Sequence, residues 1–135
     1  MLGSFFDTNV LIYVASGNPA KADRVERLIG GGGTISVQVL NEMSNVAHLK
    51  MGMSWTETRA FLSIVRRLLV VQPISLEIHE TALTLAEYYS LSIRNAMIAA
   101  SALHADCNTL WSEDLQDGMA IGSRLRVANP FQAES

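Results

Sequence analysis

The chain has 135 residues, of which 49% are hydrophobic and 17% are charged. This length predicts a single domain over residues 1–135, and this composition excludes a disordered chain. No apolar run approaches the roughly 20 residues of a membrane span, and one cysteine, Cys107, excludes a disulfide framework, so we expect a cytoplasmic protein with no membrane partner. The net charge of −3 argues against a protein that coats nucleic acid with a basic surface.

Short β-branched or aromatic runs alternate with longer helical patterns, which predicts an α/β domain on a mostly parallel sheet of about five strands. From the N-terminus we expect a strand at 5–6, a helical turn at 10–13, a helix at 19–29, a strand at 34–37 and a helix at 39–50. A helix at 55–69, a strand at 70–74 and two helices at 78–89 and 93–103 follow. Strands at 109–111 and 125–128 complete the expected sheet.

Capping signals mark where several of these elements begin or end. Asn18 and Pro19 indicate a helix start, with Asn18 as the N-cap and Pro19 in the first helical position. Ser54 and Glu57 have the spacing of a capping box. Pro73 indicates that the third strand lies at an edge of the sheet or ends early, since proline cannot donate to a neighbouring strand.

Acidic residues follow two of the expected strands directly. Asp7 comes after the first strand, and Glu113, Asp114 and Asp117 come after the fourth. Ligands of open parallel sheets bind beyond the carboxyl ends of the strands, and clustered carboxylates there need a cation or a proton to neutralise them. Mg²⁺ and Mn²⁺ suit such an oxygen-rich site. A single acid at a strand end is more often a helix cap or a turn residue, and Glu113 is expected to be a solvated turn residue.

Two further polar residues lie on expected helices. Glu42 follows Val39 by three residues and precedes Val46 by four, so helical spacing places its carboxylate on the packed apolar face. A charge there has a partner, either an arginine or a metal, although a salt bridge at the edge of the stripe is an equally good interpretation. Asn95 lies in the first turn of the helix that Ser92 is expected to cap, a position that favours an anion.

Five segments in chain order resemble the motifs of PIN-domain ribonucleases, in particular the VapC-type toxins of bacterial toxin–antitoxin pairs. FFDTNVLIY at 5–13 resembles the opening motif, SVQVLNE at 36–42 the second motif and LSIRNAMIAA at 91–100 the third. TLWSED at 109–114 resembles the strand that delivers the last acid, and NPF at 129–131 resembles the usual ending. Each motif is weak alone, but together they span nearly the whole chain and are specific.

The resemblance implies a three-layer α/β/α sandwich whose acids hold Mg²⁺ or Mn²⁺ and hydrolyse phosphodiester bonds in RNA. Transferred residue by residue, it assigns Asp7, Glu42 and Asp114 to the metal and Asn95 to the fourth catalytic position. It also implies four accessory residues. Asp117 is a further acid, and Ser112 orients a carboxylate or water. Thr8 and Asn9 support the first acid or cap the next helix. It also implies a homodimer and a cognate VapB-like antitoxin whose C-terminal segment covers the site.

Asn95 departs from the family pattern, because active members carry Asp there. An amide offers a cation one carbonyl oxygen without the negative charge, and its NH₂ group points a donor at the site. Three explanations remain: a natural relative with weakened activity, an Asp-to-Asn change introduced to silence a toxic protein, and a metal site that works without this ligand. We favour the second, because the neighbouring residues keep the active pattern and the change is isosteric.

The remaining cations and histidines carry weaker signals. The chain has eight arginines against two lysines, and arginine pairs bidentately with phosphate. Arg94, beside the expected site, is the best candidate for binding RNA. His48, His79 and His104 are scattered over helices and are expected to be surface or packing residues rather than catalysts.

The sequence admits two alternatives to an RNA-cutting toxin. The first is a non-catalytic PIN fold that binds RNA or an antitoxin, and Asn95 is the residue that suggests it. The second is a phosphatase or a phosphoacceptor receiver domain, which also places an aspartate after the first strand. Asn9 stands where the phosphatase needs a second aspartate, and the chain lacks the late strand-end lysine of a receiver domain, so the second alternative is disfavoured.

Overall fold

A six-stranded sheet with the strand order β3-β2-β1-β4-β6-β5 organises the molecule. The computed structural model describes residues 3–132, so residues 1, 2 and 133–135 of the expected domain lie outside the described part. The strands are β1 (Gly3–Phe6), β2 (Thr34–Ser36), β3 (Val70–Gln72), β4 (Cys107–Trp111), β5 (Ala120–Ile121) and β6 (Leu125–Ala128). Neighbouring strands are parallel except β5, which pairs antiparallel with β6.

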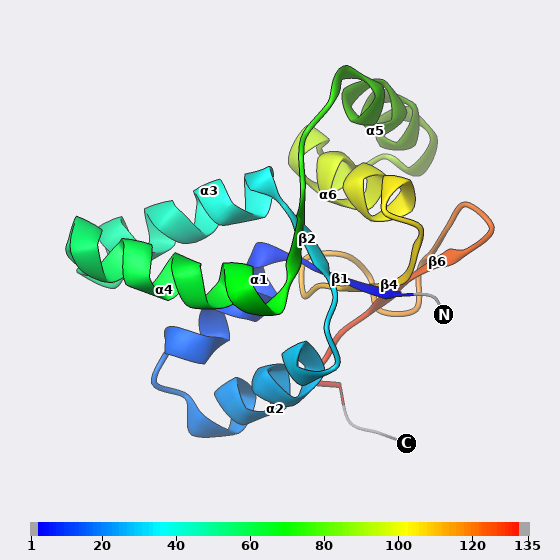
Figure 1. Cartoon of the computed structure of the whole chain (residues 1–135). Helices are drawn as coiled ribbons and strands as arrows, with labels where there is room; N and C mark the ends of the chain where they lie inside the picture. The colour runs from blue at the N-terminus through cyan, green and yellow to red at the C-terminus, as the bar shows by residue number, and fades with distance from the viewer. Residues whose placement is uncertain (1–2, 133–135) are drawn as a thin grey trace.

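Helices cover both sides of this sheet, which confirms the expected α/β/α architecture. They are α1 (Thr8–Leu11), the 3₁₀ helix η1 (Ile12–Ala15), α2 (Pro19–Gly30), α3 (Val37–Asn45), the π-helix η2 (Val46–Lys50), α4 (Trp55–Leu68), α5 (Leu76–Tyr89) and α6 (Ile93–His104). Figure 1 shows α5 and α6 on one side, α2 on the other, and α3 and α4 side by side at one end. Within residues 3–132, no helix is long and apolar enough to span a lipid bilayer.

The expected helix starts are confirmed by their capping hydrogen bonds. The Asn18 side chain accepts from the backbone N–H of Lys21, and Pro19 occupies the first turn of α2. Both bonds of the Ser54–Glu57 capping box are present at the start of α4. Each cap satisfies a backbone donor that the first helical turn leaves without a partner. Capping residues within one helical turn therefore determine where these helices begin.

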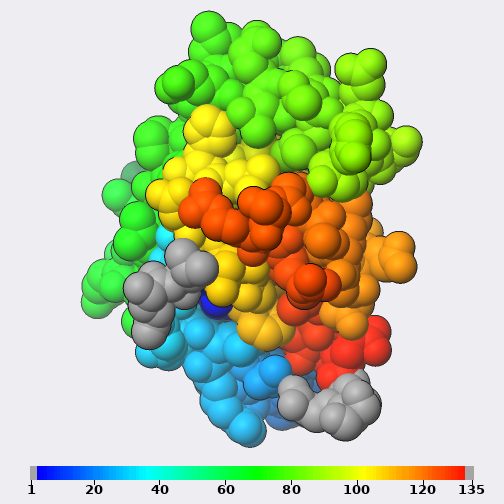
Figure 2. All heavy atoms as spheres, turned by 90° about the vertical axis from the view of Figure 1, so that its right-hand side faces the viewer, coloured from blue at the N-terminus to red at the C-terminus, as the bar shows by residue number. Residues whose placement is uncertain are grey.

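The hydrophobic core lies on both faces of the two central strands. Phe5 and Phe6, adjacent on β1, are both fully buried, as expected for a parallel strand covered by helices on each side. Alanines make up much of the buried face of α6, including Ala96 and Ala99, and their small side chains let this helix pack closely on β4 and β2. Figure 2 shows α5 next to α6 at one end of the molecule and α2 at the other.

The structure differs from the sequence-based expectation at three elements. The sheet has six strands where about five were expected, because the two-residue strand β5 is too short to carry an alternating pattern. The third strand ends at Gln72 because Pro73 follows, and it lies at the edge of the sheet as proline predicted. The helix expected at 39–50 is α3, which starts at Val37 because Ser36 caps it, and it ends in the π-helical turn η2.

The strand order changes direction between β1 and β4. From β1 the chain proceeds outward through β2 and β3, whereas β4, β6 and β5 lie on its other side. Ligand sites of open α/β sheets lie beyond the carboxyl ends of the strands at such a point. The pairing of Phe6 with Trp111, together with the hydrogen bond from the Asp7 N–H to the Trp111 carbonyl at 2.9 Å, brings the two strand ends together there.

Gly33 lies in the tightly packed connection between α2 and β2. A Cβ atom at Gly33, whose φ is +153°, would lie 2.9 Å from the Ser4 carbonyl oxygen and 2.6 Å from Phe6 Cε2. We expect Gly33→Ala to lower the free energy of unfolding by about 2 kcal/mol or more in urea denaturation, because backbone and a core ring must both move. Gly30→Ala is the control: its Cβ meets nothing within 4 Å, so stability should be unchanged or slightly higher.

Candidate active site

Asp7 lies at the carboxyl end of β1 and is fully buried. Its Oδ1 accepts from the Thr8 N–H at 2.7 Å, so it also serves as the N-cap of α1. Its Oδ2 accepts from Asn9 Nδ2 at 3.2 Å and from Ser112 Oγ at 2.7 Å. A buried carboxylate with this many donors is held in one orientation. Both interpretations of Asp7, as a helix cap and as a site residue, are thus compatible with its position.

Glu42 reaches the same place from α3. Its Oε1 accepts a hydrogen bond from Thr8 Oγ1, which lies next to Asp7 in the chain, and its Oε2 accepts from Gln38 Nε2 at 3.4 Å. Thr8 therefore connects α1 to the second acid, a role beyond local capping. The side chain of Glu42 is partly buried, as its place on the apolar face of the helix predicts.

The end of β4 contributes the third acid and its support. The fully buried Ser112 donates to Asp7 and accepts from the Asp114 N–H at 3.1 Å, which positions the loop that carries Asp114. Asn9 performs a similar function from α1, because its Oδ1 accepts from the Glu113 N–H at 3.1 Å. Ser112 and Asn9 thus hold the two strand ends together through their side chains.

The guanidinium of Arg94, in the first turn of α6, lies among these acids. Its Nη2 is 2.6 Å from Asp7 Oδ1 and 2.6 Å from Glu42 Oε1, and its Nε donates to Glu42 Oε2 at 3.1 Å. Its Nη1 donates to Asp7 Oδ2 at 3.2 Å, Asn95 Oδ1 at 2.9 Å and Asp114 Oδ2 at 3.3 Å. Arg94 is therefore bidentate to both Asp7 and Glu42, the strongest geometry for this kind of pair.

This arrangement shifts the pKa values of Glu42 and Arg94 in opposite directions. Burial favours the neutral form of Glu42, but hydrogen bonds from Arg94 and Thr8 and the charge of Arg94 outweigh it, so the pKa of Glu42 lies below its ordinary value. Burial also opposes the charge of Arg94, yet its bonds to Glu42 and Asp7 raise the pKa of the guanidinium. Glu42 and Arg94 are thus both charged at neutral pH.

The residues do not fit a divalent cation in this arrangement. Asp7, Glu42 and Asp114 supply the carboxylate oxygens that Mg²⁺ prefers, and Asn95 supplies one carbonyl oxygen. The guanidinium of Arg94, however, contacts all four of these side chains. Among residues 3–132, no three His, Cys, Asp or Glu side chains are arranged to hold a metal ion.

Two residues have contacts other than those expected. Arg94, the predicted phosphate ligand, donates to the acids instead, and its guanidinium has only about five N–H groups for the six contacts described above. Asp117 is not among the acceptors of Arg94. Its Oδ1 accepts from the Asn129 N–H at 2.7 Å, so it fastens the loop after β4 to the end of β6.

Sequence reasoning missed two features around the site. Gln38 lies one helical turn before Glu42, and its Nε2 also donates to the Arg94 carbonyl oxygen at 3.3 Å. The spacing of four residues was the available signal. Glu113, expected to be a solvated turn residue, accepts from the Tyr13 hydroxyl at 2.9 Å and forms an ion pair with Lys21 at 3.8 Å. No sequence spacing relates Glu113 to Tyr13 and Lys21, since it comes from a distant segment.

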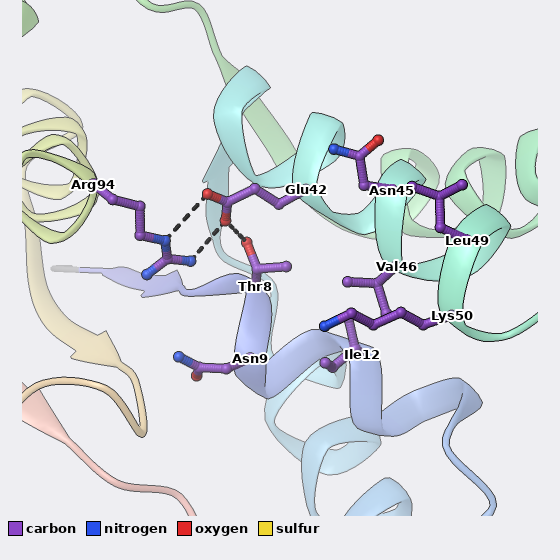
Figure 3. A pocket seen from close by; sticks show the side chains of 9 residues that line it. All are labelled: Thr8, Asn9, Ile12, Glu42, Asn45, Val46, Leu49, Lys50 and Arg94. Carbon is purple, nitrogen blue, oxygen red and sulfur yellow. Dashed lines mark hydrogen bonds and ion pairs between the residues drawn. The ribbon is translucent and has the colours of Figure 1, made fainter.

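A pocket opens beside the acids. It lies between α1 with η1 and α3 with η2, and its lining combines polar residues of the site with side chains further out. The lining residues are Thr8, Asn9, Ile12, Glu42, Asn45, Val46, Leu49, Lys50 and Arg94. Figure 3 shows Arg94 and Thr8 pointing toward Glu42 at one end, and Leu49 and Lys50 at the other. A ligand in this pocket would contact the acid cluster at one end only.

Comparison with known proteins identifies the family. Residues 4–116 match the PIN domain family. No curated protein sequence matches the chain closely enough to be counted.

Solved structures of similar fold include several toxin–antitoxin complexes. A chain of a toxin–antitoxin complex from Klebsiella pneumoniae is 24% identical with a TM-score of 0.73, and the match covers 96% of this chain and 99% of that one. A chain of the DNA-bound VapBC complex from Salmonella typhimurium is 18% identical with a TM-score of 0.68 and coverages of 96% and 99%. VapC20 from Mycobacterium tuberculosis, a sarcin-ricin loop cleaving toxin, is 17% identical with a TM-score of 0.67 and coverages of 82% and 91%. At these identities the likeness confirms the fold.

Arg94→Gln tests the ion pairs directly. We expect a loss of about 2–4 kcal/mol in the free energy of unfolding at pH 7 in a chelating buffer, because the fully buried Asp7 loses its charged partner. In the parent protein the pKa of Glu42 is lowered, so the stability that Glu42 contributes is present above about pH 4.5 and is lost as the pH falls. In the variant the burial of Glu42 remains without Arg94, its pKa rises, and stability should increase as the pH falls from 7 to 5.

Denaturation midpoints measured across this pH range check the sign. Arg67→Gln removes the same charge from an exposed position of α4 and should leave both the stability and its pH dependence nearly unchanged. Parallel pH profiles for the parent protein and Arg94→Gln would contradict the assigned contacts.

Proposed function

The chain belongs to the PIN domain family, and from this premise we propose that it acts on RNA as the toxin of a bacterial toxin–antitoxin pair. The observation that carries the proposal is the convergence of Asp7, Glu42 and Asp114 beyond the carboxyl ends of β1 and β4. Three acids from distant segments meet there at the direction change of a parallel sheet. This is the place and the chemistry expected for a hydrolytic centre that acts on phosphodiester bonds.

In the proposed centre, each residue has a role that its contacts support. Asp7, Glu42 and Asp114 are the hydrolytic acids, and a carboxylate among them takes a proton from the attacking water. Thr8, Asn9 and Ser112 orient these acids. Asn95 occupies the fourth position without a charge, so phosphodiester hydrolysis by this chain is weakened or silenced. Mg²⁺ or Mn²⁺ is the proposed cofactor of the centre once the fourth acid is restored and the acids are free of Arg94.

The proposed partner is a cognate antitoxin. The similar folds from Klebsiella pneumoniae and Salmonella typhimurium occur in toxin–antitoxin and VapBC complexes. In this chain the pocket that leads to the acids has apolar walls formed by Ile12, Val46 and Leu49, a surface suited to a peptide segment of such a partner. We also propose a homodimer and a cytoplasmic location, in agreement with the family resemblance.

A second candidate function is a non-catalytic PIN domain that binds RNA or an antitoxin without cutting. The contacts of Arg94 and the presence of Asn95 favour it, because both occupy positions that hydrolysis needs. The two candidates share the fold and the partner and differ in whether restoring the acids restores cleavage.

Cleavage of labelled single-stranded RNA with Mg²⁺ or Mn²⁺ separates the two candidates. We expect little or no cleavage by the parent protein and clear cleavage by the double variant Arg94→Gln/Asn95→Asp, because that variant has four acids and no guanidinium among them. Adding Asp7→Asn to the double variant should reduce cleavage by at least about 100-fold, the order expected for an electrostatic group at a reacting centre.

Transfer, ribosomal and messenger RNA fragments serve as substrates, since the class of RNA is open. If the double variant leaves all of them intact, hydrolysis is wrong. RNA binding or antitoxin binding by the parent protein would then support the non-catalytic candidate.

A further inference from the structure

We propose that Arg94 is a built-in cation that replaces the divalent metal of the acid cluster, so that the protein keeps this cluster intact without metal and excludes metal from it. The inference rests on the proposed function only for the identity of the cluster as the former hydrolytic centre. It assigns the exclusion of metal to Arg94, whereas the sequence alone directs attention to Asn95.

Arg94 uses the oxygens that a metal would need. A hard cation would bind Asp7, Glu42 and Asp114 through their carboxylate oxygens. Both oxygens of Asp7 and both oxygens of Glu42 accept from its guanidinium, at 2.6 to 3.2 Å. Asp114 Oδ2 and Asn95 Oδ1 accept from the same group. A metal cannot bind among these side chains while the guanidinium stays.

The formal charge of the cluster also matches that of a metal-bound cluster. Three carboxylates and one guanidinium have a formal charge of minus two, and four carboxylates around one divalent cation have the same formal charge. Asn95 and Arg94 are adjacent in the chain, and together they supply the positive charge that a metal would bring to a four-acid cluster. Asn95 removes one negative charge and Arg94 adds one positive charge. Groups of the chain itself therefore give the cluster the same formal charge that a four-acid cluster has with its metal bound.

The fold also holds Arg94 in this position. Ser92 caps α6 through the Asn95 N–H at 3.1 Å, and Gln38 donates to the Arg94 carbonyl oxygen, so the backbone on each side of the side chain is fixed. A cation in the first turn of a helix is unfavourable beside the positive end of the helix dipole. Asp7 and Glu42 compensate this cost, and they do so only when the guanidinium points at them.

The inference predicts that restoring Asp at position 95 is not sufficient. Arg94 Nη1 already donates to Asn95 Oδ1, so a carboxylate in that place would give Arg94 another charged partner. Asn95→Asp alone should hold the guanidinium more firmly. Removing Arg94 should instead leave the carboxylates to a metal ion.

Mn²⁺ titration, followed by electron paramagnetic resonance of free Mn²⁺, tests this without RNA. We expect no saturable binding up to about 5 mM for the parent protein, for Asn95→Asp, and for Arg94→Lys, which keeps a positive charge. Arg94→Gln should bind Mn²⁺, and Arg94→Gln/Asn95→Asp should bind it at least about tenfold more tightly, because it adds a charged ligand. Binding in these two variants should disappear with Asp7→Asn.

Thermal unfolding gives a second readout on the same proteins. A ligand that binds only the folded state raises the Tm, so Mn²⁺ in place of chelator should raise the Tm of the two Arg94→Gln forms by about 5 °C or more and leave the parent Tm unchanged. Arg67→Gln is the charge-matched control and should behave as the parent does.

Saturable Mn²⁺ binding by the parent protein, or equal binding by Asn95→Asp and the double variant, would overturn the inference. If Arg94→Gln fails to fold, the Asn95→Asp and Arg94→Lys titrations still decide it, because both keep a cation at position 94. Failure of the proposed RNA cleavage is a separate result, since metal binding and Tm are measured with no RNA present.

Discussion

The contact between the Arg94 guanidinium and the carboxylates of Asp7 and Glu42 is the interaction on which the centre of this molecule depends. Asp7 is fully buried, and a buried carboxylate without a cationic partner costs several kcal/mol. Arg94 supplies that partner from α6, while Glu42 approaches from α3 and Asp7 from the end of β1. Three elements that are distant in the sequence therefore meet at one charged group, and the planar fork of arginine suits this better than the single ammonium of lysine.

The pairing of the strands places these groups close together. Parallel pairing of β1 with β4 places Asp7 beside Ser112, and α6 packs on β4 and β2 with its first turn near the same edge. The fold is that of the PIN domain family, and the place of the cluster follows from the strand order. In this chain, position 94 gives the cluster an internal cation, and position 95 places a neutral amide beside its three acids.

Most of the fold could be predicted from the sequence, because it is encoded in short-range patterns. Caps such as Asn18 and Ser54 act within one helical turn, and buried strands such as 5–6 are recognisable from their composition. The acids Asp7 and Glu42 could be located by strand ends and helical spacing. The partner of Glu42 could be limited to an arginine or a metal but not chosen, since that choice depends on how α6 is oriented on the sheet. The contact of Asp117 with Asn129 and the two-residue strand β5 depend on tertiary packing in the same way.

A crystal structure of the parent protein grown with Mn²⁺, with anomalous diffraction recorded to locate the metal, tests the central claim most directly. The account predicts density for the Arg94 guanidinium between Asp7 and Glu42 and no anomalous peak within bonding distance of either carboxylate. An anomalous peak bound by Asp7 and Asp114, with the Arg94 side chain turned out to solvent, would contradict it.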